Sequence, residues 1–162
     1  MPTAAPPIDP PHRLRGAQDW HALLALIQRA FAAMAGRIDP PSSLHHLTAA
    51  DLAAQSETAE IWAIGAPIRA CMILTPKPAA LYLGKLAVDP AHQRSGLGRA
   101  LVSHAETRAR ALGLPVLGLQ TRIELIENQA AFTAMGFAEV ARTAHPGHTK
   151  PTSITYAKPI HP

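Results

Sequence analysis

The sequence predicts a mixed α/β domain in which helices pack on the faces of one mixed sheet. Two segments, near residues 20–36 and 96–112, repeat apolar residues at helical spacing, whereas several shorter runs have the composition of strands. These segments follow one another in the order β, α, α, β, β, β, α, β, α, β, β. A strand meander followed by strands that alternate with helices is typical of a mixed sheet covered by helices.

Local capping signals set the limits of the elements in the first half of the chain. Asp19 is placed to begin a helix that ends at Gly36, and Ser43 or Thr48 is placed to cap the short helices after it. Gly65 separates two β-rich runs and predicts a hairpin. The elements expected here are an edge strand at residues 12–17, a helix at 20–36, one or two short helices within 37–55, and strands at 59–64, 67–76 and 79–90.

Glycines mark the ends of both helices in the second half. Gly113 follows a helix that runs from Gly96 to Leu112, and Gly136 follows a short helix that we expect to begin at Asn128. An N-cap is therefore one role for Asn128. The remaining elements expected are strands at residues 115–121, 137–143 and 152–158.

The chain length suits one domain. At 162 residues, of which 48% are hydrophobic, the chain can bury a single core. We expect this domain to span residues 12–162 after a disordered, proline-rich tail at residues 1–11. No run approaches the roughly 20 apolar residues of a membrane helix, and the prolines near the start are unlike a secretory signal. These features predict a cytoplasmic protein without a membrane partner.

Two glycines, Gly96 and Gly98, stand in the first turn of a helix that follows a strand. Unpaired backbone N–H groups and the positive end of the helix dipole meet at such a position and favour an anion. Glycine removes the Cβ atoms that would keep an oxygen away, while Arg94 and Arg99 add positive charge. The alternative is that the glycines only shape a turn, at a cost of about 1 kcal/mol each relative to alanine.

Two well-known phosphate loops do not fit this stretch. A nucleoside-triphosphate loop needs Lys-Ser or Lys-Thr after its last glycine, where this chain has Arg99 and Ala100. A dinucleotide fingerprint needs a third glycine at Leu101 and an acidic residue after the next strand, where this chain has Gln120 and Thr121.

Gln93, Gly96 and Gly98 instead fill the pattern Gln/Arg-x-x-Gly-x-Gly/Ala. With "LAVDP" before the loop and "AMGF" after the next helix, residues 81–137 resemble the GCN5-related N-acetyltransferase (GNAT) family. The glycine spacing is weak by itself, but the strand, long helix, second strand and Gly-Phe in this order are fairly specific. The resemblance implies a central mixed, mostly antiparallel sheet of six to seven strands flanked by about four helices, formed by one N-acetyltransferase domain.

The resemblance also implies that acetyl-CoA is the co-substrate. In the family the pyrophosphate lies on the N–H groups of the loop, which here are those of Arg94, Ser95, Gly96, Leu97, Gly98 and Arg99. The pantetheine arm pairs like an extra strand with the strand before the loop, which implies contacts with Leu86, Ala87 and Val88. A backbone N–H near Leu86 would polarise the acetyl carbonyl as an oxyanion donor does. Asn128 resembles an asparagine that touches the cofactor in many members.

Phe132, which the resemblance also implies as a contact of the cofactor, departs from the family pattern. Many members have a tyrosine four residues before the Gly-Phe pair, and its hydroxyl is placed to protonate the leaving thiolate, which phenylalanine cannot do. Either another group replaces this acid at Phe132, or the thiolate leaves without one, which is chemically tolerable because a cysteine-like thiol has a pKa near 8.5. Phe132 also fits a non-catalytic acyl-CoA-binding or regulatory module, the alternative function.

The resemblance predicts direct attack by a primary amine in a ternary complex, with a small-molecule acceptor favoured over a protein N-terminus. The amine must lose a proton before it attacks. His45 and Glu124 are the candidate bases, since histidine titrates near neutrality; the alternatives are an exposed helical turn for His45 and a surface ion pair with Arg122 for Glu124. His145 and His148 lie in a loop expected to be a plain connection, or else to overhang the acceptor.

The composition limits the remaining partners. A net charge of +4 and a sequence pI of 9.7 suit an anionic small molecule as well as nucleic acid, and without a basic block we expect no nucleic-acid partner. The lone Cys71 excludes a cysteine-based zinc site and suits a buried core position, and no histidine pair has the i, i+4 spacing, so we expect no metal. Exposed edge strands such as residues 152–158 would allow a homodimer.

Overall fold

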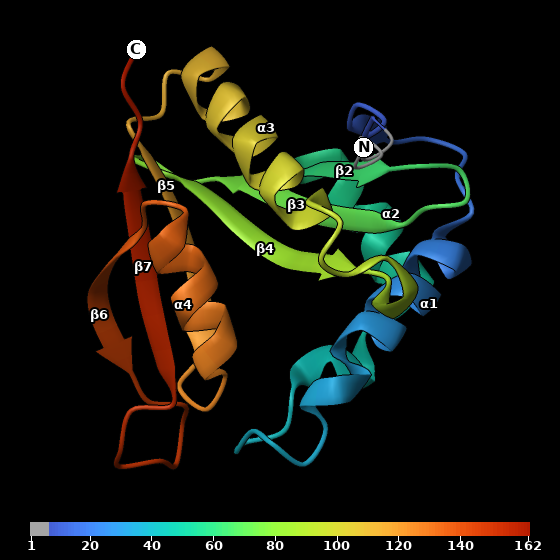
Figure 1. Cartoon of the computed structure of the whole chain (residues 1–162). Helices are drawn as coiled ribbons and strands as arrows, with labels where there is room; N and C mark the ends of the chain where they lie inside the picture. Colours follow the sequence, from blue (N-terminus) through green and yellow to red (C-terminus); the bar gives the residue numbers. More distant parts are fainter. Residues whose placement is uncertain (1–6) are drawn as a thin grey trace, which may run out of the picture.

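The computed structural model describes residues 7–162, which form one seven-stranded sheet flanked by four α-helices (Figure 1). Three short 3₁₀ segments complete the order, at Ala32–Met34, Ser43–His46 and Pro90–His92. The main elements are β1 (His12–Leu14), α1 (Trp20–Phe31), α2 (Ala49–Thr58), β2 (Glu60–Ile64), β3 (Ala70–Pro76), β4 (Leu81–Val88), α3 (Leu97–Ala111), β5 (Val116–Arg122), α4 (Ile126–Ala134), β6 (Ala138–Thr143) and β7 (Ser153–Pro159). The predicted order and the mixed α/β class are confirmed.

The strands lie in the order β1-β2-β3-β4-β5-β7-β6, and all neighbours are antiparallel except β4 and β5. The sheet is thus mixed and mostly antiparallel, as the family resemblance implied. The expectation that residues 152–158 form an exposed edge was wrong, because β7 pairs with β5 on one side and with β6 on the other. β1 and β6 are the two edges.

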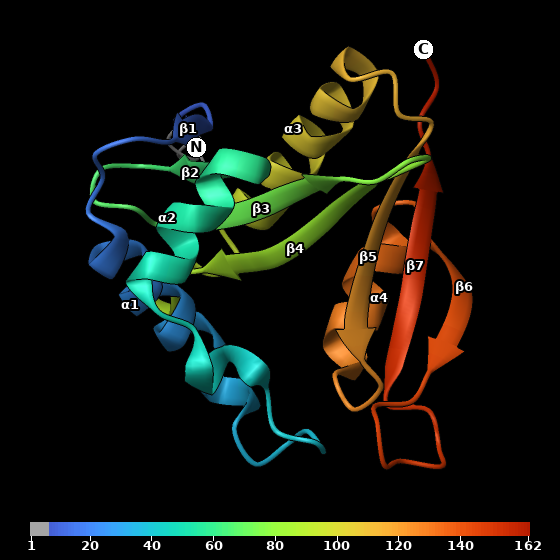
Figure 2. The same ribbon diagram turned by 180° about the vertical axis from the view of Figure 1, so that it is seen from behind.

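Helices cover both faces of the sheet. Figure 1 shows α3 and α4 in front of it, and Figure 2 shows α2 on the opposite face. α3 buries Leu97, Leu101 and Ala105 in a core that also contains residues of β3, β4, β5 and β7. α1 and α2 form a second core with the other face of β2 and β3, in which Leu23 and Leu52 are fully buried. The two cores hold the strands that carry the site.

Side-chain caps begin both α-helices of the first half at predicted residues, whereas Ser42, and not Ser43 as expected, caps the 3₁₀ turn at Ser43–His46. The Asp19 carboxylate accepts a hydrogen bond from the Ala22 N–H at 3.0 Å, and Thr48 forms a reciprocal capping box with Asp51 at the start of α2. α1 ends at Phe31 and continues as a 3₁₀ turn to Met34, so the regular helix is shorter than expected.

The expectation that Asn128 begins the last helix was wrong. α4 begins at Ile126 after Leu125, which makes no side-chain cap, because a turn in which the Leu125 N–H bonds to the Arg122 carbonyl starts the helix early. Asn128 therefore lies inside the first turn. Its side-chain amide donates to the Thr121 hydroxyl on β5 at 3.4 Å.

The predicted tail at residues 1–11 is only partly described, since residues 1–6 lie outside the described residues. In the described part, the Asp9 carboxylate accepts a hydrogen bond from Arg69 at 2.7 Å. Ile8 lies close to the glycine loop, with its Cδ1 3.4 Å from where a Cβ at Gly96 would be. No helix within residues 7–162 has the length and apolar character that a membrane crossing requires.

Candidate functional site

The sheet opens between β4 and β5. These parallel strands are in register only at Leu81 with Leu117 and Tyr82 with Gly118, although β4 continues to Val88 and β5 to Arg122. Both views show the two ribbons diverging toward one end of the molecule (Figures 1 and 2). Beyond Tyr82 the facing edges of β4 and β5 no longer pair with each other, so backbone groups on these edges can pair with a ligand instead.

A bulge in β4 lies at this opening. Cys71 pairs with Ala87 and Ile73 pairs with Gly84, so Lys85 and Leu86 together lie opposite one residue of β3. Lys85 has φ +47°, a left-handed conformation that is uncommon for a residue with a side chain. The bulge re-aims the backbone just where the strands separate.

The glycine loop and the β4 edge line one pocket of about 670 Å³, the loop pocket. Ten of the eleven predicted cofactor residues line it: Leu86, Ala87, Val88, Arg94, Gly96, Leu97, Gly98, Arg99, Asn128 and Phe132. The exception is Ser95, whose hydroxyl donates to the His92 carbonyl. The fold therefore brings residues from β4, α3 and α4 around one cavity, as the resemblance implied.

The start of α3 has the features of an anion site. Gly96 adopts φ +85° as the residue before the helix, and Arg94 adopts φ +63°. Within residues 7–162, no hydrogen bond outside the helix ladder uses the N–H groups of Gly96, Leu97 or Gly98. Since the first N–H groups of a helix have no partner inside it, they are available to phosphate oxygens. The residues present thus fit the diphosphate of a coenzyme A ester.

A second cavity of about 330 Å³, the strand pocket, shares six lining residues with the loop pocket: Phe31, Met34, Leu86, Leu125, Asn128 and Phe132. It extends between β4 and β5, and its charged or titratable residues are Tyr82, Lys85, Arg122 and His145. No aspartate or glutamate is among the described residues that line it. Two ligands bound in the two pockets would meet at Leu86.

Burial and nearby cations control the protonation of the strand pocket. Burial, followed by the charges of Arg122 and His148, lowers the pKa of His145 below its ordinary value, and Glu124 opposes this shift. Burial also raises the pKa of Tyr82. The ring of His145 contacts the Thr152 hydroxyl through Nδ1, and its backbone N–H donates to the same oxygen at 2.9 Å. These effects favour the neutral imidazole of His145, and the contacts with Thr152 fix the position of its ring.

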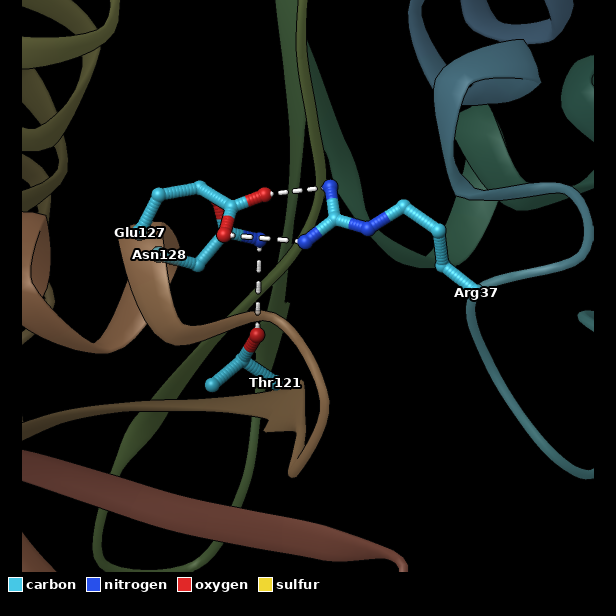
Figure 3. A network of polar contacts seen from close by, with 4 residues as sticks. All are labelled: Arg37, Thr121, Glu127 and Asn128. Atoms are coloured by element: carbon cyan, nitrogen blue, oxygen red, sulfur yellow. Dashed lines mark hydrogen bonds and ion pairs between the residues drawn. The ribbon is translucent and has the colours of Figure 1, made fainter.

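Residues 37–41, the bridging segment, connect the two sides of the opening. Figure 3 shows Arg37 reaching Glu127 on α4, and the two hydrogen bonds measure 2.5 and 3.0 Å. This hydrogen-bonded pairing lowers the pKa of Glu127 to about 2. The Asp39 N–H donates to Glu124 at 2.8 Å, and Arg122 donates to the Pro40 carbonyl at 2.8 Å. The bridging segment, which follows α1 in the chain, is thus held by three side chains of the β5–α4 region.

The two predicted bases lie outside the strand pocket. His45 is exposed on its 3₁₀ turn and lines a neighbouring apolar cavity, which shares Phe31, Met34, Ser42 and Leu44 with the strand pocket. Glu124 lines another cavity together with His148 and makes no ion pair with Arg122 among the described residues. The role of general base therefore stays a prediction for both residues, because neither lines the strand pocket beside Leu86.

Sequence reasoning did not single out Tyr82 or Lys85, and it treated Arg122 only as a partner for Glu124. Lys85 lies beside a predicted contact residue, but its direction depends on the bulge, which has no signal in the sequence. His145 comes from the β6–β7 loop, so the fold gives it the overhanging position that was the less favoured alternative.

Cys71 has the buried core position expected of it. It is fully buried, which raises its pKa to about 12, and its thiol lies 3.8 Å from the Lys85 carbonyl oxygen. Within residues 7–162, no three histidine, cysteine, aspartate or glutamate side chains are grouped closely enough to hold a metal ion.

Known proteins share parts of the sequence and the whole fold. The [ribosomal protein bS18]-alanine N-acetyltransferase of Escherichia coli (strain K12) is 39% identical over 57 residues, which are 35% of this chain and 38% of that protein. The chain thus matches under two fifths of the length of this curated relative. The crystal structure of the ribosomal-protein-S18-alanine N-acetyltransferase from Escherichia coli has a TM-score of 0.69 at 25% identity and covers 93% of this chain and 94% of its own.

Two further structures share the fold at lower identity. A GNAT-family acetyltransferase from Desulfovibrio desulfuricans has a TM-score of 0.75 at 18% identity and covers 93% of this chain and 98% of its own. The PaiA N-acetyltransferase from Thermoplasma acidophilum, solved in complex with coenzyme A, has a TM-score of 0.72 at 13% identity and covers 92% and 98%. Residues 20–137 match the model of the acetyltransferase (GNAT) family. Because this match spans most of the chain and includes the glycine loop, the chain belongs to the acetyltransferase (GNAT) family.

Proposed function

We propose that the chain is a cytoplasmic, acetyl-CoA-dependent N-acetyltransferase that acetylates a primary amine of a small molecule by direct attack in a ternary complex. The observation that carries the proposal is the meeting of two pockets at Leu86, one beside an anion-binding helix start and the other lined by polar side chains. Family membership supports an acyl-CoA donor, and one structural relative was solved with coenzyme A.

The residues of the loop pocket would bind the donor. The N–H groups of Gly96, Leu97 and Gly98 bind the diphosphate, with Arg94 and Arg99 as flanking charges. The edge of β4 at Leu86 to Val88 pairs with the pantetheine arm, because β5 has diverged from it. The Leu86 N–H donates to the thioester oxygen and stabilises the negative charge that develops there during attack.

The bridging segment favours a small acceptor over a protein N-terminus. Its contacts with Arg122, Glu124 and Glu127 connect the α1 side to the α4 side beside the strand pocket, which measures about 330 Å³. A pocket of this size is at the small end of ligand sites. The acceptor of the Escherichia coli relative is a ribosomal protein by name, so a peptide amine is the comparison to test.

His145 is the group we assign as proton acceptor. It lines the strand pocket, has a lowered pKa that favours the neutral imidazole, and is held by Thr152. The amine nitrogen forms a bond to the acetyl carbon as the carbon–sulfur bond breaks, the amine proton passes to His145 directly or through water, and coenzyme A leaves as a thiolate. Because a thiol of this kind is a good leaving group, the thiolate can leave without a general acid, and no other residue has to supply the hydroxyl that Phe132 lacks. Glu124 and His45 would act only through intervening water.

Calorimetric titration with acetyl-CoA tests the donor site. Gly98→Glu places a carboxylate in the loop pocket without backbone strain, because Gly98 lies within α3 and has no positive φ. Ser103→Glu adds the same charge on the exposed face of α3 and is the matched control. We expect wild type and Ser103→Glu to bind alike and Gly98→Glu to lose binding. Wild-type protein that does not bind acetyl-CoA would refute the proposal.

A non-catalytic acyl-CoA-binding module is the second candidate, and Phe132 favours it. The Phe132 ring packs edge-on against Phe137 at 5.9 Å and supplies no hydroxyl to the shared wall of the two pockets. Such a module would bind acetyl-CoA in the titration but release no coenzyme A thiol with any amine, whereas the enzyme releases thiol in proportion to acetylated amine.

A further inference from the structure

The strand pocket is positively charged and has no carboxylate of its own. Its lining includes Lys85 and Arg122, and no aspartate or glutamate within residues 7–162 lines it. Both side chains are half-buried. A cluster of like charges in a partly desolvated cavity is unfavourable unless an anion balances it. The positive charge of the strand pocket therefore indicates that the ligand supplies a negative charge.

Neither cation has an acidic partner among the described residues. Lys85 takes part in no ion pair. Arg122 donates only to the carbonyl oxygens of Pro40 and Pro41, at 2.8 and 3.4 Å. A guanidinium has five N–H donors, so several of those on Arg122 have no acceptor. An acidic group on a ligand can accept from them.

The carboxylates on the neighbouring turn are already engaged. Glu127 forms the two hydrogen bonds with Arg37 that Figure 3 shows, and Glu124 accepts from the Asp39 N–H. Glu127 therefore faces the bridging segment, whereas the second carboxylate oxygen of Glu124, Oε1, is buried without a hydrogen-bond partner among the described residues. Neither acid forms an ion pair with Lys85 or Arg122. The charge of the strand pocket is therefore separate from the ion pair beside it.

The position of Lys85 relates this charge to the reaction. Lys85 precedes Leu86 directly, and both residues form the β4 bulge at which the two pockets meet. A ligand whose amine lies at Leu86 can therefore place a second group near Lys85 only if a short chain joins the two groups. The nearby cations also disfavour the ammonium form of the ligand and so favour the neutral amine that attacks.

We infer that the acceptor is a small primary amine that carries an anionic oxygen group, a carboxylate or a phosphate, bound between Lys85 and Arg122. This inference rests on the proposed function and adds the chemical class of the acceptor. A plain amine, a polyamine or any other purely cationic acceptor meets only like charge in the strand pocket. An amine with an acidic substituent supplies the missing partner and forms charge-assisted hydrogen bonds with the two side chains.

Matched pairs of amines test the inference. Release of coenzyme A thiol from acetyl-CoA is measured with β-alanine and β-alaninamide, with O-phosphoethanolamine and ethanolamine, with spermidine, and with a short peptide that has a free N-terminus. We expect the anionic member of at least one pair to react about tenfold faster or more than its neutral partner, as expected for hydrogen bonds to charged groups. The pair that shows the preference distinguishes carboxylate from phosphate.

Variants of Lys85 and Arg122 test whether these side chains cause the preference for anionic amines. Lys85→Gln should reduce the ratio between the anionic and neutral amines, whereas Lys77→Gln removes the same charge from the turn between β3 and β4, outside both pockets, and should leave the ratio unchanged. Arg122→Gln is the second variant, and its effect is compared with that of Arg37→Gln, because both arginine side chains hold the bridging segment but only Arg122 lines the strand pocket. Acetyl-CoA affinity is measured for every variant, so that a failed donor site is recognised separately.

Binding without turnover gives a second readout. Each amine is titrated calorimetrically into the protein saturated with coenzyme A, and the inference requires that an anionic member binds more tightly than its neutral partner. Faster turnover of spermidine, the peptide or the neutral amines would overturn the inference. Equal binding within both pairs, or no binding of either anionic member while coenzyme A binds, would also overturn it.

Discussion

Replacing Gly98 by alanine should stabilise the free protein and at the same time weaken its binding of acetyl-CoA. Gly98 is the second residue of α3, and a Cβ built there meets only Val88 Cγ2, at 3.9 Å, which is an ordinary contact. Glycine inside a helix is about 0.5–1 kcal/mol less favourable than alanine. We therefore expect Gly98→Ala to raise the free energy of unfolding by up to about this amount.

The same methyl group should obstruct the diphosphate. Gly98 lines the loop pocket, and its N–H belongs to the first turn of α3, where N–H groups have no intrahelical partner. A hydrogen bond to a charged group contributes about 1.5–3 kcal/mol. Loss of one such contact corresponds to about tenfold to a hundredfold weaker binding. Stability and affinity should thus change in opposite directions in one variant.

Gly96→Ala is the matched comparison, since its expected effect on stability has the opposite sign. Gly96 adopts φ +85°, and a left-handed conformation costs a residue with a Cβ about 1–2 kcal/mol. Urea unfolding gives both changes in stability, and calorimetry gives both affinities for acetyl-CoA. A Gly98→Ala protein that is more stable and binds acetyl-CoA as tightly as wild type would refute the reasoning, and would show that the glycine only shapes the turn.

Three further predictions concern a core ion pair, the base and the missing hydroxyl. Glu60→Gln should lower the free energy of unfolding by about 2–3 kcal/mol, because Glu60 is 6% exposed and accepts two 2.8 Å hydrogen bonds from Arg108. Arg108 lowers the Glu60 pKa, so this stabilisation is present above the unfolded-state pKa and is lost as pH falls through the folded-state value; urea titrations across acidic pH should show that loss in wild type only. His145→Gln should reduce kcat/KM about a hundredfold or more and remove the acidic limb of the pH profile, which lies below the ordinary histidine pKa, whereas equal losses in His148→Gln would contradict the assignment. Phe132→Tyr should leave kcat largely unchanged, and a large acceleration in thiol release would instead identify a missing acid.

The sequence predicted the loop pocket better than the strand pocket because the two are encoded differently. Gly96 and Gly98 shape the backbone within one turn, so their spacing in the sequence reports the local geometry of the loop pocket directly. Lys85 and His145 reach the strand pocket from a bulge in β4 and from the β6–β7 loop, which are brought together only by the sheet order. No local pattern connects residues 60 positions apart.

Two further expectations, for the start of the last helix and for a sheet edge, were wrong for different reasons. Asn128 has the side chain of a cap, but the turn at Leu125 begins α4 before it, and the amide donates to Thr121 instead. Residues 152–158 have the composition of a strand, but composition does not show whether a strand has one neighbour or two, and β7 has two. A local turn decided the first case, and strand pairing decided the second.

One structural feature determines where the loop pocket and the strand pocket meet. β4 and β5 pair over two residues and then diverge, and the β4 bulge at Lys85 and Leu86 lies beyond the last pair. If the strands stayed paired to Val88, their ladder would use the backbone groups that a pantetheine arm needs, and it would close the strand pocket. The bulge carries the strained backbone at Lys85 (φ +47°), and such strain persists only where the surrounding fold enforces it. The two cores that hold β3 and β5 enforce it here, so the opening is a property of the folded sheet.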